Sequence, residues 1–228
     1  MTDPTPAARG LVEPAPAAAS TVFGARLPVA ERFVEHLATT AVEWGLLGPR
    51  ELPRLWNRHV LNCAVLAELV PEGGAVVDIG SGAGLPGIAL AVARPDLRVT
   101  LVEPLERRVT WLESVVADLG LDVVVRRARA EDLHGELAAP VVTARAVAPL
   151  RRLAEWGLPL VEPGGELLAI KGRTAQDELD AARVVLSRLG AAGADVVECG
   201  VGLVQTATTV VRVRVAVASG RTVGRRAR

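Results

Sequence analysis

Val76-Val77-Asp78-Ile79-Gly80-Ser81-Gly82-Ala83-Gly84 is the most informative stretch of the chain, because an apolar strand runs directly into a turn with glycine at every second position. Glycine leaves the backbone of such a turn open, so a ligand can approach its main-chain N–H groups. A helix over residues 86–94 follows, and its positive dipole end faces the same ligand. Residues 76–94 therefore predict a strand, a nucleotide-type pocket and a helix.

Two classes of cofactor fit this turn. Gly82-Ala83-Gly84-Leu85-Pro86-Gly87 satisfies the dinucleotide fingerprint, and Glu103 follows at the spacing of an acidic residue that accepts ribose hydroxyls. Asp78 separates the classes, because dinucleotide folds usually carry an apolar residue there, whereas a carboxylate suits an amino or sulfonium group. We therefore expect S-adenosylmethionine, and Glu103 supports the pocket with either cofactor.

Length and composition limit the architecture and the chemistry. The 228 residues suffice for one α/β domain with a small extension. A formal net charge of zero gives no whole-molecule support for nucleic-acid binding, and the abundance of arginine reflects composition bias, since Lys171 is the only lysine. Cys63 and Cys199 lack the spacing of metal ligands, so we expect reduced, buried cysteines and no metal.

The two ends of the chain differ in composition from the rest. Residues 1–22 are rich in Pro and Ala and lack the pattern of a signal peptide, so we expect a disordered lead and a cytoplasmic protein. No apolar run reaches the length of a membrane helix, and we expect a monomer with no membrane partner. The basic residues 219–228 predict a solvated disordered tail, with an RNA-tethering arm as the alternative.

Hydrophobic periodicity divides the remainder into a helical cap over residues 23–70 and an α/β domain over residues 71–218. Strands and helices alternate in the second part, which predicts a parallel sheet. The expected strands are Ala75–Ile79, Arg98–Val102, Asp122–Arg126, Val141–Ala144, Gly165–Ile170, Asp195–Cys199 and Thr208–Val217. The short link before the last strand implies an antiparallel pair. We expect a Rossmann-like class I methyltransferase fold, a mostly parallel seven-stranded sheet with an antiparallel last strand and an N-terminal helical cap.

Five segments of the chain form a recognisable set: Arg58-His59-Val60-Leu61-Asn62, the stretch from Asp78 to Gly87, Arg129-Ala130-Glu131, Ala144-Arg145-Ala146 and Lys171-Gly172. Together they resemble the RsmG family, also called glucose-inhibited division protein B, over about residues 26–217. Members of that family are bacterial methyltransferases that act on guanine N7 in small-subunit ribosomal RNA. The resemblance therefore implies S-adenosylmethionine as cofactor, and 16S ribosomal RNA or the small ribosomal subunit as partner.

The resemblance also implies roles for individual residues. Family positions that hold the cofactor match Gly80, Leu85, Ala130, Glu131 and Arg145, and with the residues argued above the expected cofactor set is Asp78, Gly80, Gly82, Gly84, Leu85, Glu103, Ala130, Glu131 and Arg145. Arg129 and Lys171 match basic positions at the same mouth. One departure is Ala139-Pro140-Val141, where the family more often has an Asp that could brace the loop.

Guanine N7 has a free lone pair and no proton to lose, so methyl transfer to it needs in-line placement and no general base. Other acceptors leave marks that this sequence lacks: a pocket cysteine for cytosine C5, a Pro-Pro-aromatic motif after the fourth strand for exocyclic amines, and several lysines for ribose. Two alternatives remain. An NAD(P)-dependent oxidoreductase lacks support because tyrosine is absent, and a non-catalytic RNA-binding scaffold would be expected to have lost part of the pocket.

Arg145 and Lys171 are the expected catalytic residues, as holders of guanine O6, an RNA phosphate or the methionine carboxylate, and the alternative is a salt bridge to Asp78 or Glu131. His59 is expected to be a satisfied core histidine. The four tryptophans are expected in the core. The expected RNA-binding residues are Arg107, Arg108, Arg126, Arg127, Arg129 and Lys171, of which the first two fit an ordinary solvated helix turn equally well.

Overall fold

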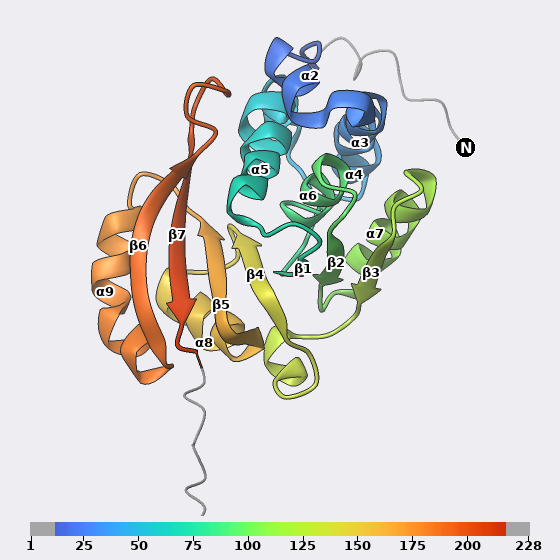
Figure 1. Ribbon diagram of the computed structural model, residues 1–228. Helices are drawn as coiled ribbons and strands as arrows, with labels where there is room; N and C mark the ends of the chain where they lie inside the picture. The colour runs from blue at the N-terminus through green and yellow to red at the C-terminus, as the bar shows by residue number, and fades with distance from the viewer. Residues whose placement is uncertain (1–11, 218–228) are drawn as a thin grey trace, which may run out of the picture.

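The computed structural model describes residues 12–217, so the expectations for the first eleven residues and for the basic tail lie outside the described residues. Seven strands form one sheet in the order β3-β2-β1-β4-β5-β7-β6 (Figure 1). They are β1 (Ala75–Ile79), β2 (Arg98–Val102), β3 (Val123–Arg126), β4 (Ala139–Arg145), β5 (Val161–Ile170), β6 (Ala191–Cys199) and β7 (Thr208–Val215). Strand β7 is antiparallel to both β5 and β6, whereas β1 to β5 pair in parallel, which confirms the predicted sheet.

The helical segments are α2 (Ala17–Phe23), η1 (Gly24–Arg26), α3 (Leu27–Ala38), α4 (Thr40–Glu43), η2 (Pro49–Arg54), η3 (Leu55–Val60), α5 (Leu61–Ala64), η4 (Val65–Leu69), α6 (Gly87–Ala93), α7 (Glu106–Asp118), η5 (Ala130–Leu133), α8 (Leu150–Gly157), η6 (Leu158–Leu160) and α9 (Ala175–Arg188). Segment η3 is a π-helical turn and the other η segments are 3₁₀ turns. The second half of the cap is therefore a series of short segments. It begins with the 3₁₀ turn η2, and the two prolines of η2, Pro49 and Pro53, disfavour a longer α-helix there, since proline lacks the N–H donor of a helix.

The cap begins earlier than expected. Helix α2 starts at Ala17, inside the stretch expected to be a disordered lead, which corrects that boundary. The reason is burial, because Ala19 and Phe23 lie in the core, where the ring of Phe23 packs against that of Trp56. Their contacts come from other helices and leave no local sign in a Pro- and Ala-rich sequence.

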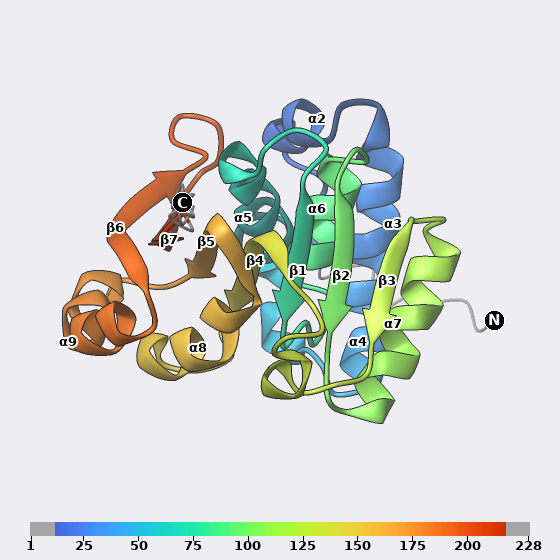
Figure 2. The same cartoon turned by 60° about the horizontal axis from the view of Figure 1, so that its bottom comes forward.

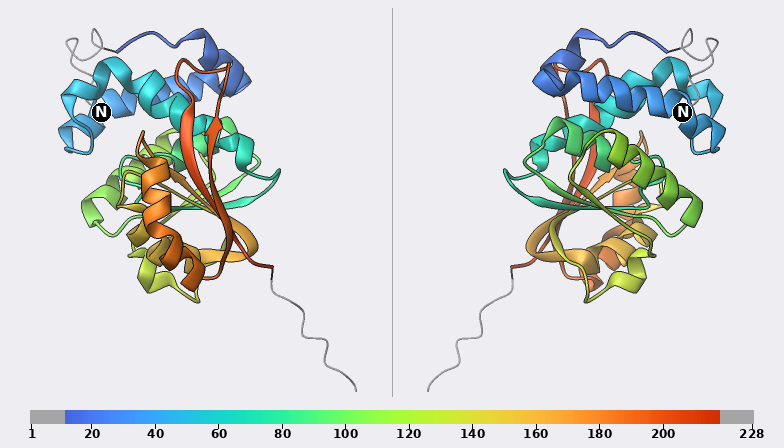
Figure 3. Two further views of the ribbon diagram at one scale, coloured as in Figure 1. Left: turned by 90° about the vertical axis from the view of Figure 1, so that its left-hand side faces the viewer. Right: turned by 90° about the vertical axis from the view of Figure 1, so that its right-hand side faces the viewer.

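Helices cover both faces of the sheet, so the central strands contribute side chains to two cores, whereas the edge strand β3 contributes to only one. Val76 of β1 packs with the cap, α6 and α7, whereas Val77 and Ile79 pack with α8 and α9. Figure 3 shows the sheet edge-on between the N-terminal helices and the helices of the C-terminal half. This two-residue alternation is the one predicted for a doubly covered sheet. Among residues 12–217, no helix combines the length and the apolar character needed to cross a membrane.

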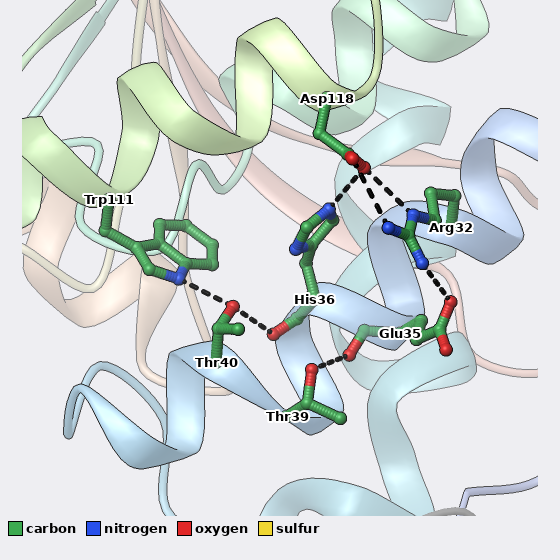
Figure 4. Close-up of polar contacts among 7 residues, drawn as sticks. All are labelled: Arg32, Glu35, His36, Thr39, Thr40, Trp111 and Asp118. Atoms are coloured by element: carbon green, nitrogen blue, oxygen red, sulfur yellow. Dashed lines mark hydrogen bonds and ion pairs between the residues drawn. The ribbon is translucent and has the colours of Figure 1, made fainter. Parts of the chain in front are cut away.

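Polar contacts fasten the cap to α7 (Figure 4). Asp118 Oδ2 lies 2.7 Å from His36 Nε2 and accepts a hydrogen bond from Arg32 Nε at 2.9 Å. About two turns earlier on α7, Trp111 Nε1 donates to Thr40 Oγ1 at 2.9 Å. Because α7 follows β2, these contacts fix the cap relative to the carboxyl ends of the central strands, and Figure 2 shows α4 beside those ends.

Candidate active site

A cavity of about 600 Å³ opens at the carboxyl ends of β1, β2 and β4, where open α/β sheets bind ligands. Its walls come from the loops that follow these strands, from η5, from the loop after α4 and from α8. The residues that line it are Leu46, Leu47, Ile79, Gly80, Ser81, Gly82, Ala83, Leu85, Val102, Glu103, Pro104, Leu105, Arg108, Ala128, Arg129, Ala130, Glu131, Arg145, Ala146, Val147 and Trp156. The cavity therefore lies between the cap and the carboxyl edge of the sheet.

The glycine turn forms one wall, and its glycines serve different purposes. Gly82 has φ +54° and a Cβ there would meet only Gly80 O, at 3.8 Å, so the position borders open space. Gly84 has φ +75°, and a Cβ there would come within 2.4 Å of the Ile88 side chain, so glycine allows α6 to pack. Gly82 therefore keeps the cavity open, while Gly84 supports the wall from behind.

Asp78 lies behind this wall, and that placement differs from the expected contact with the cofactor. Its side chain is fully buried and does not line the cavity. Oδ2 accepts a hydrogen bond from Gly87 N at 3.1 Å, so Asp78 occupies the start of α6 that was expected to face the ligand. Oδ1 has no hydrogen-bond partner, and burial raises the pKa of this carboxyl to about 7.

Glu103 lines the cavity and is held by two backbone donors. Its Oε2 accepts from Gly82 N and its Oε1 accepts from Leu105 N, both at 3.0 Å, and Arg108 Nη1 lies 3.6 Å from Oε2. Each carboxylate oxygen retains a second lone pair. The arrangement fits the expected role of accepting two neighbouring hydroxyls of a ribose. Ala130 and Glu131 also line the cavity.

Arg145 lines the cavity at the end of β4, and its partners come from the cap. Nη1 donates to Arg58 O at 3.2 Å, and Nη2 lies 2.8 Å from Nδ1 of His59. The other ring nitrogen of His59, Nε2, lies 2.8 Å from Glu51 Oε2. Burial and the Arg145 charge lower the pKa of His59 to about 4, so the ring is neutral at pH 7. His59 is thus buried with partners for both nitrogens, as expected.

Lys171 does not line the cavity, which differs from its expected place at the mouth. Its Nζ donates to Ala148 O at 2.7 Å and to Glu178 Oε2 at 2.8 Å. Glu178 Oε2 also accepts from Leu150 N at 2.8 Å. Lys171 and Glu178 therefore brace the turn between β4 and α8, in which Ala146 has φ +54°. The alternative of a salt bridge was right in kind, although the partner is neither Asp78 nor Glu131.

The five arginines expected to contact RNA fall into two groups. Arg107 donates to Trp44 O, Arg108 approaches Glu103, and Arg127 Nη1 lies 3.0 Å from Glu106 Oε2. Arg126 and Arg129 are exposed, and Arg129 also lines the cavity. Arg108 and Arg129 are the two of these arginines that line the cavity, and Arg129 is the exposed one.

Several lining residues were not anticipated. Trp156 was expected in the core, but it is half-buried, lines the cavity and has the Arg152 guanidinium 5.1 Å from its ring centroid. Leu46 and Leu47 reach the cavity from the cap. Their only sequence signal is an apolar pair between two glycines, which does not indicate a distant partner.

The cysteines contribute no nucleophile to the cavity. Cys63 is fully buried, and burial raises the pKa of its thiol to about 11. Cys199 is also buried and unpaired. Within residues 12–217, no group of three or more His, Cys, Asp or Glu side chains could hold a metal ion.

Comparison with known proteins adds a family. A family model described as "GidB: rRNA small subunit methyltransferase G" matches residues 26–206. A ribosomal RNA small subunit methyltransferase G of Rhodococcus jostii is 58% identical over 199 residues, covering 86% of this chain and 88% of the relative. Its namesake in Streptomyces coelicolor is 57% identical over 209 residues, covering 91% and 87% of the two chains.

Solved structures support the fold. A methyltransferase from Pyrococcus furiosus gives a TM-score of 0.51 at 15% identity, over 67% of this chain and 80% of that one. TYW2 of M. jannaschii, solved in complex with AdoMet, gives 0.54 at 16% identity, over 71% and 78%. At these identities the likeness concerns the fold alone.

Proposed function

Because the chain belongs to the family described as rRNA small subunit methyltransferase G, we propose that it transfers a methyl group from S-adenosylmethionine to N7 of a guanine in 16S ribosomal RNA. The resemblance to the RsmG family is confirmed by this membership, and the oxidoreductase alternative falls with it. In the proposed setting the enzyme acts in the cytoplasm, as a monomer, on the small ribosomal subunit.

The residues around the cavity fit S-adenosylmethionine. Glu103 has two lone pairs left for the ribose hydroxyls, Gly82 leaves room for the ligand against the backbone, and Ala130 and Glu131 would flank the adenine. When bound, this cofactor supplies a methyl group on a positively charged sulfur. The chain's own task is then to orient the acceptor and to exclude competing acceptors.

The composition of the cavity lining supports an acceptor that loses no proton, such as N7. The residues that line the cavity include neither His, Cys, Lys nor Tyr. Of its two carboxylates, Glu103 is already held by two N–H groups, and Glu131 is exposed and is assigned to the adenine. A guanine N7 loses no proton, so it needs no general base. The burial of Cys63 disfavours the covalent route used for cytosine C5. Arg145 is the remaining holder, because its guanidinium enters the cavity whereas Lys171 braces a turn.

Methyl transfer to small ribosomal subunits that lack this modification tests the proposal. Tritiated S-adenosylmethionine is the donor, and nucleosides from the product are identified by mass spectrometry. Labelled 7-methylguanosine is the expected product. Cofactor binding by calorimetry without any transfer would favour the non-catalytic RNA-binding scaffold, and another methylated nucleoside would replace the assigned acceptor.

A further inference from the structure

We propose that His59 and Glu51 are positioning residues that orient Arg145 for methyl transfer, an inference that rests on the proposed function. The three side chains form a line from the surface of the cap to the cavity: Glu51 on η2, His59 on η3 and Arg145 at the end of β4. Only Arg145 lines the cavity. The other two would act through it.

The hydrogen-bonding chemistry allows one arrangement of protons along this line. An arginine side chain carries only donors, so Arg145 Nη2 donates to His59 Nδ1 across 2.8 Å. A ring nitrogen that accepts cannot carry a proton, so the proton of the neutral imidazole is on Nε2. Nε2 then donates to Glu51 Oε2 across 2.8 Å. The carboxylate thereby selects the tautomer that Arg145 requires.

A second contact of Arg145 comes from the same segment. Nη1 donates to Arg58 O at 3.2 Å, and Arg58 directly precedes His59 in the π-helical turn η3. The buried thiol of Cys63, on α5 of the cap, is a third hydrogen-bond partner of Arg145. Of the five guanidinium N–H groups, those that these partners leave unused are available for acceptors in the cavity. An arginine side chain has several rotatable bonds, so fixed partners reduce the number of orientations that it samples before substrate binds.

Charged groups around His59 support this role. Burial first, and then the charges of Arg145 and Arg58, lower the pKa of His59, whereas Glu51 opposes them. Arg58 Nε lies 3.7 Å from Glu51 Oε2, but Arg58 is well exposed. The Glu51 side chain is 27% exposed, so its replacement leaves the buried core intact.

The test uses the full chain and a matched pair from elsewhere in the cap. The variants are Glu51→Ala and His59→Asn, since an Asn oxygen can accept in place of Nδ1. The controls are Asp118→Ala and His36→Asn, because His36 and Asp118 form a similar pair that lies outside the cavity. Single-turnover methyl transfer is measured at saturating cofactor and subunit, and thermal melting verifies folding.

We expect Glu51→Ala to lower the rate about tenfold, His59→Asn to lose less, and both controls to remain within about twofold of the native rate. In an Arg145→Ala background, Glu51→Ala should cause no further loss, because Glu51 acts through Arg145. Equal losses in both backgrounds, or equal losses in the controls, would mean that Glu51 only supports the cap and would overturn the inference.

A spectroscopic measurement separates this inference from the proposed function. Nitrogen-15 NMR of the histidines should show His59 as the neutral Nε2–H tautomer, and Arg145→Gln should raise its pKa from about 4, because a positive neighbour is removed. A proton on Nδ1, or a pKa unaffected by Arg145→Gln, sinks the inference even if methyl transfer occurs. An inactive native protein would refute the proposed function. The NMR result would then still show whether Arg145 donates to His59 Nδ1.

Discussion

Two histidines of the cap each face a carboxylate at almost the same distance, 2.7 Å for His36 and Asp118 and 2.8 Å for His59 and Glu51. In the outer pair, His36 and Asp118, the neighbouring Arg32 binds the carboxylate, and this contact fastens the cap to α7 (Figure 4). In the inner pair, His59 and Glu51, the neighbouring Arg145 binds the histidine and lines the cavity. Similar local chemistry thus serves docking in one place and orientation in the other, according to which atom the arginine meets.

The largest expected effect tests whether the cavity beside the inner pair is the cofactor site. Gly82→Val should weaken S-adenosylmethionine binding by at least about 100-fold in calorimetry, because the side chain would project from the turn into the cavity. Gly120→Val is the matched control: Gly120 has a similar φ of +59° and no atom within 4 Å of an added Cβ. Both variants carry about 1–2 kcal/mol of backbone strain. Normal S-adenosylmethionine binding by Gly82→Val would show that this cavity is not the cofactor site.

The two arginines of the pairs should respond very differently to lysine. Arg145→Lys should slow methyl transfer on the order of 100-fold, because an ammonium group cannot reproduce the planar fork that meets both His59 Nδ1 and Arg58 O. Arg32→Lys should leave the rate within about twofold, since Arg32 belongs to the docking pair. Rates are compared under single-turnover conditions. Similar losses in the two variants would show that both pairs merely stabilise the cap.

A third carboxylate, Asp78, should make the protein less stable as pH rises, whereas Asp118 should make it more stable as pH rises. Its folded-state pKa is raised to about 7, so the folded state holds the proton more tightly than the unfolded chain, and stability falls as pH rises from about 4 to 7. Asp78→Asn removes this dependence. The variant should gain about 2 kcal/mol over native protein between about pH 5.5 and pH 7, at about 1.4 kcal/mol per pH unit. Urea unfolding of cofactor-free protein measures it, and parallel pH curves would contradict the raised pKa.

A smaller effect separates Arg129, an exposed arginine that lines the cavity, from Arg127, an exposed arginine that is paired with a carboxylate. Arg129→Ala should weaken binding of the small subunit several-fold and reduce the salt slope of log K by about one, with cofactor affinity unchanged. Arg127→Ala should do less, because Arg127 already pairs with Glu106. Filter binding at several salt concentrations makes the comparison. Equal slopes for both variants would place the RNA path away from Arg129.

The smallest effect belongs to the docking pair. Its partners lower the pKa of Asp118 to about 2, so its contribution to stability is present above about pH 4 and is lost as pH falls from there towards 2. Asp118→Asn should therefore cost about 1 kcal/mol at pH 7, the upper range for a partly exposed pair, and progressively less below pH 4. Thermal melting measures this cost. An equal cost at pH 3 and pH 7 would show that the charge of Asp118 is not what fastens the cap.

The strands were predicted well because their signals are local. Ala75–Ile79 and Arg98–Val102 have the predicted ends, since the first lies between two glycines and the second is followed by Glu103 and Pro104. The longer strands β5 and β6 begin four residues earlier than expected, and β5 continues past a bulge opposite Ala139 and Val141. Pairing with a neighbour extends these strands across residues whose own preference is a turn.

The site was predicted less completely than the sheet. Glu103, Arg145, Gly80 and Gly82 line the cavity, because each follows a strand at the carboxyl edge, whereas Gly84 of the same turn lies behind it against Ile88. Lys171 also follows a strand, yet Glu178 from α9 draws its side chain away from the cavity. A position at a strand end predicts where a backbone lies, but the direction of a long side chain depends on partners that are distant in sequence.

The order of residues alone was sufficient for the methyltransferase fold, the glycine turn, the acidic residue Glu103 and the family resemblance. The glycine turn and Glu103 are visible within a short stretch of chain, and the fold and the resemblance rest on the order of several such local segments. Three-dimensional packing was needed to place Asp78 behind the turn, Trp156 in the cavity and His59 beside Arg145. His59 and Arg145 are 86 residues apart, and such contacts form only when the cap closes over the ends of the strands.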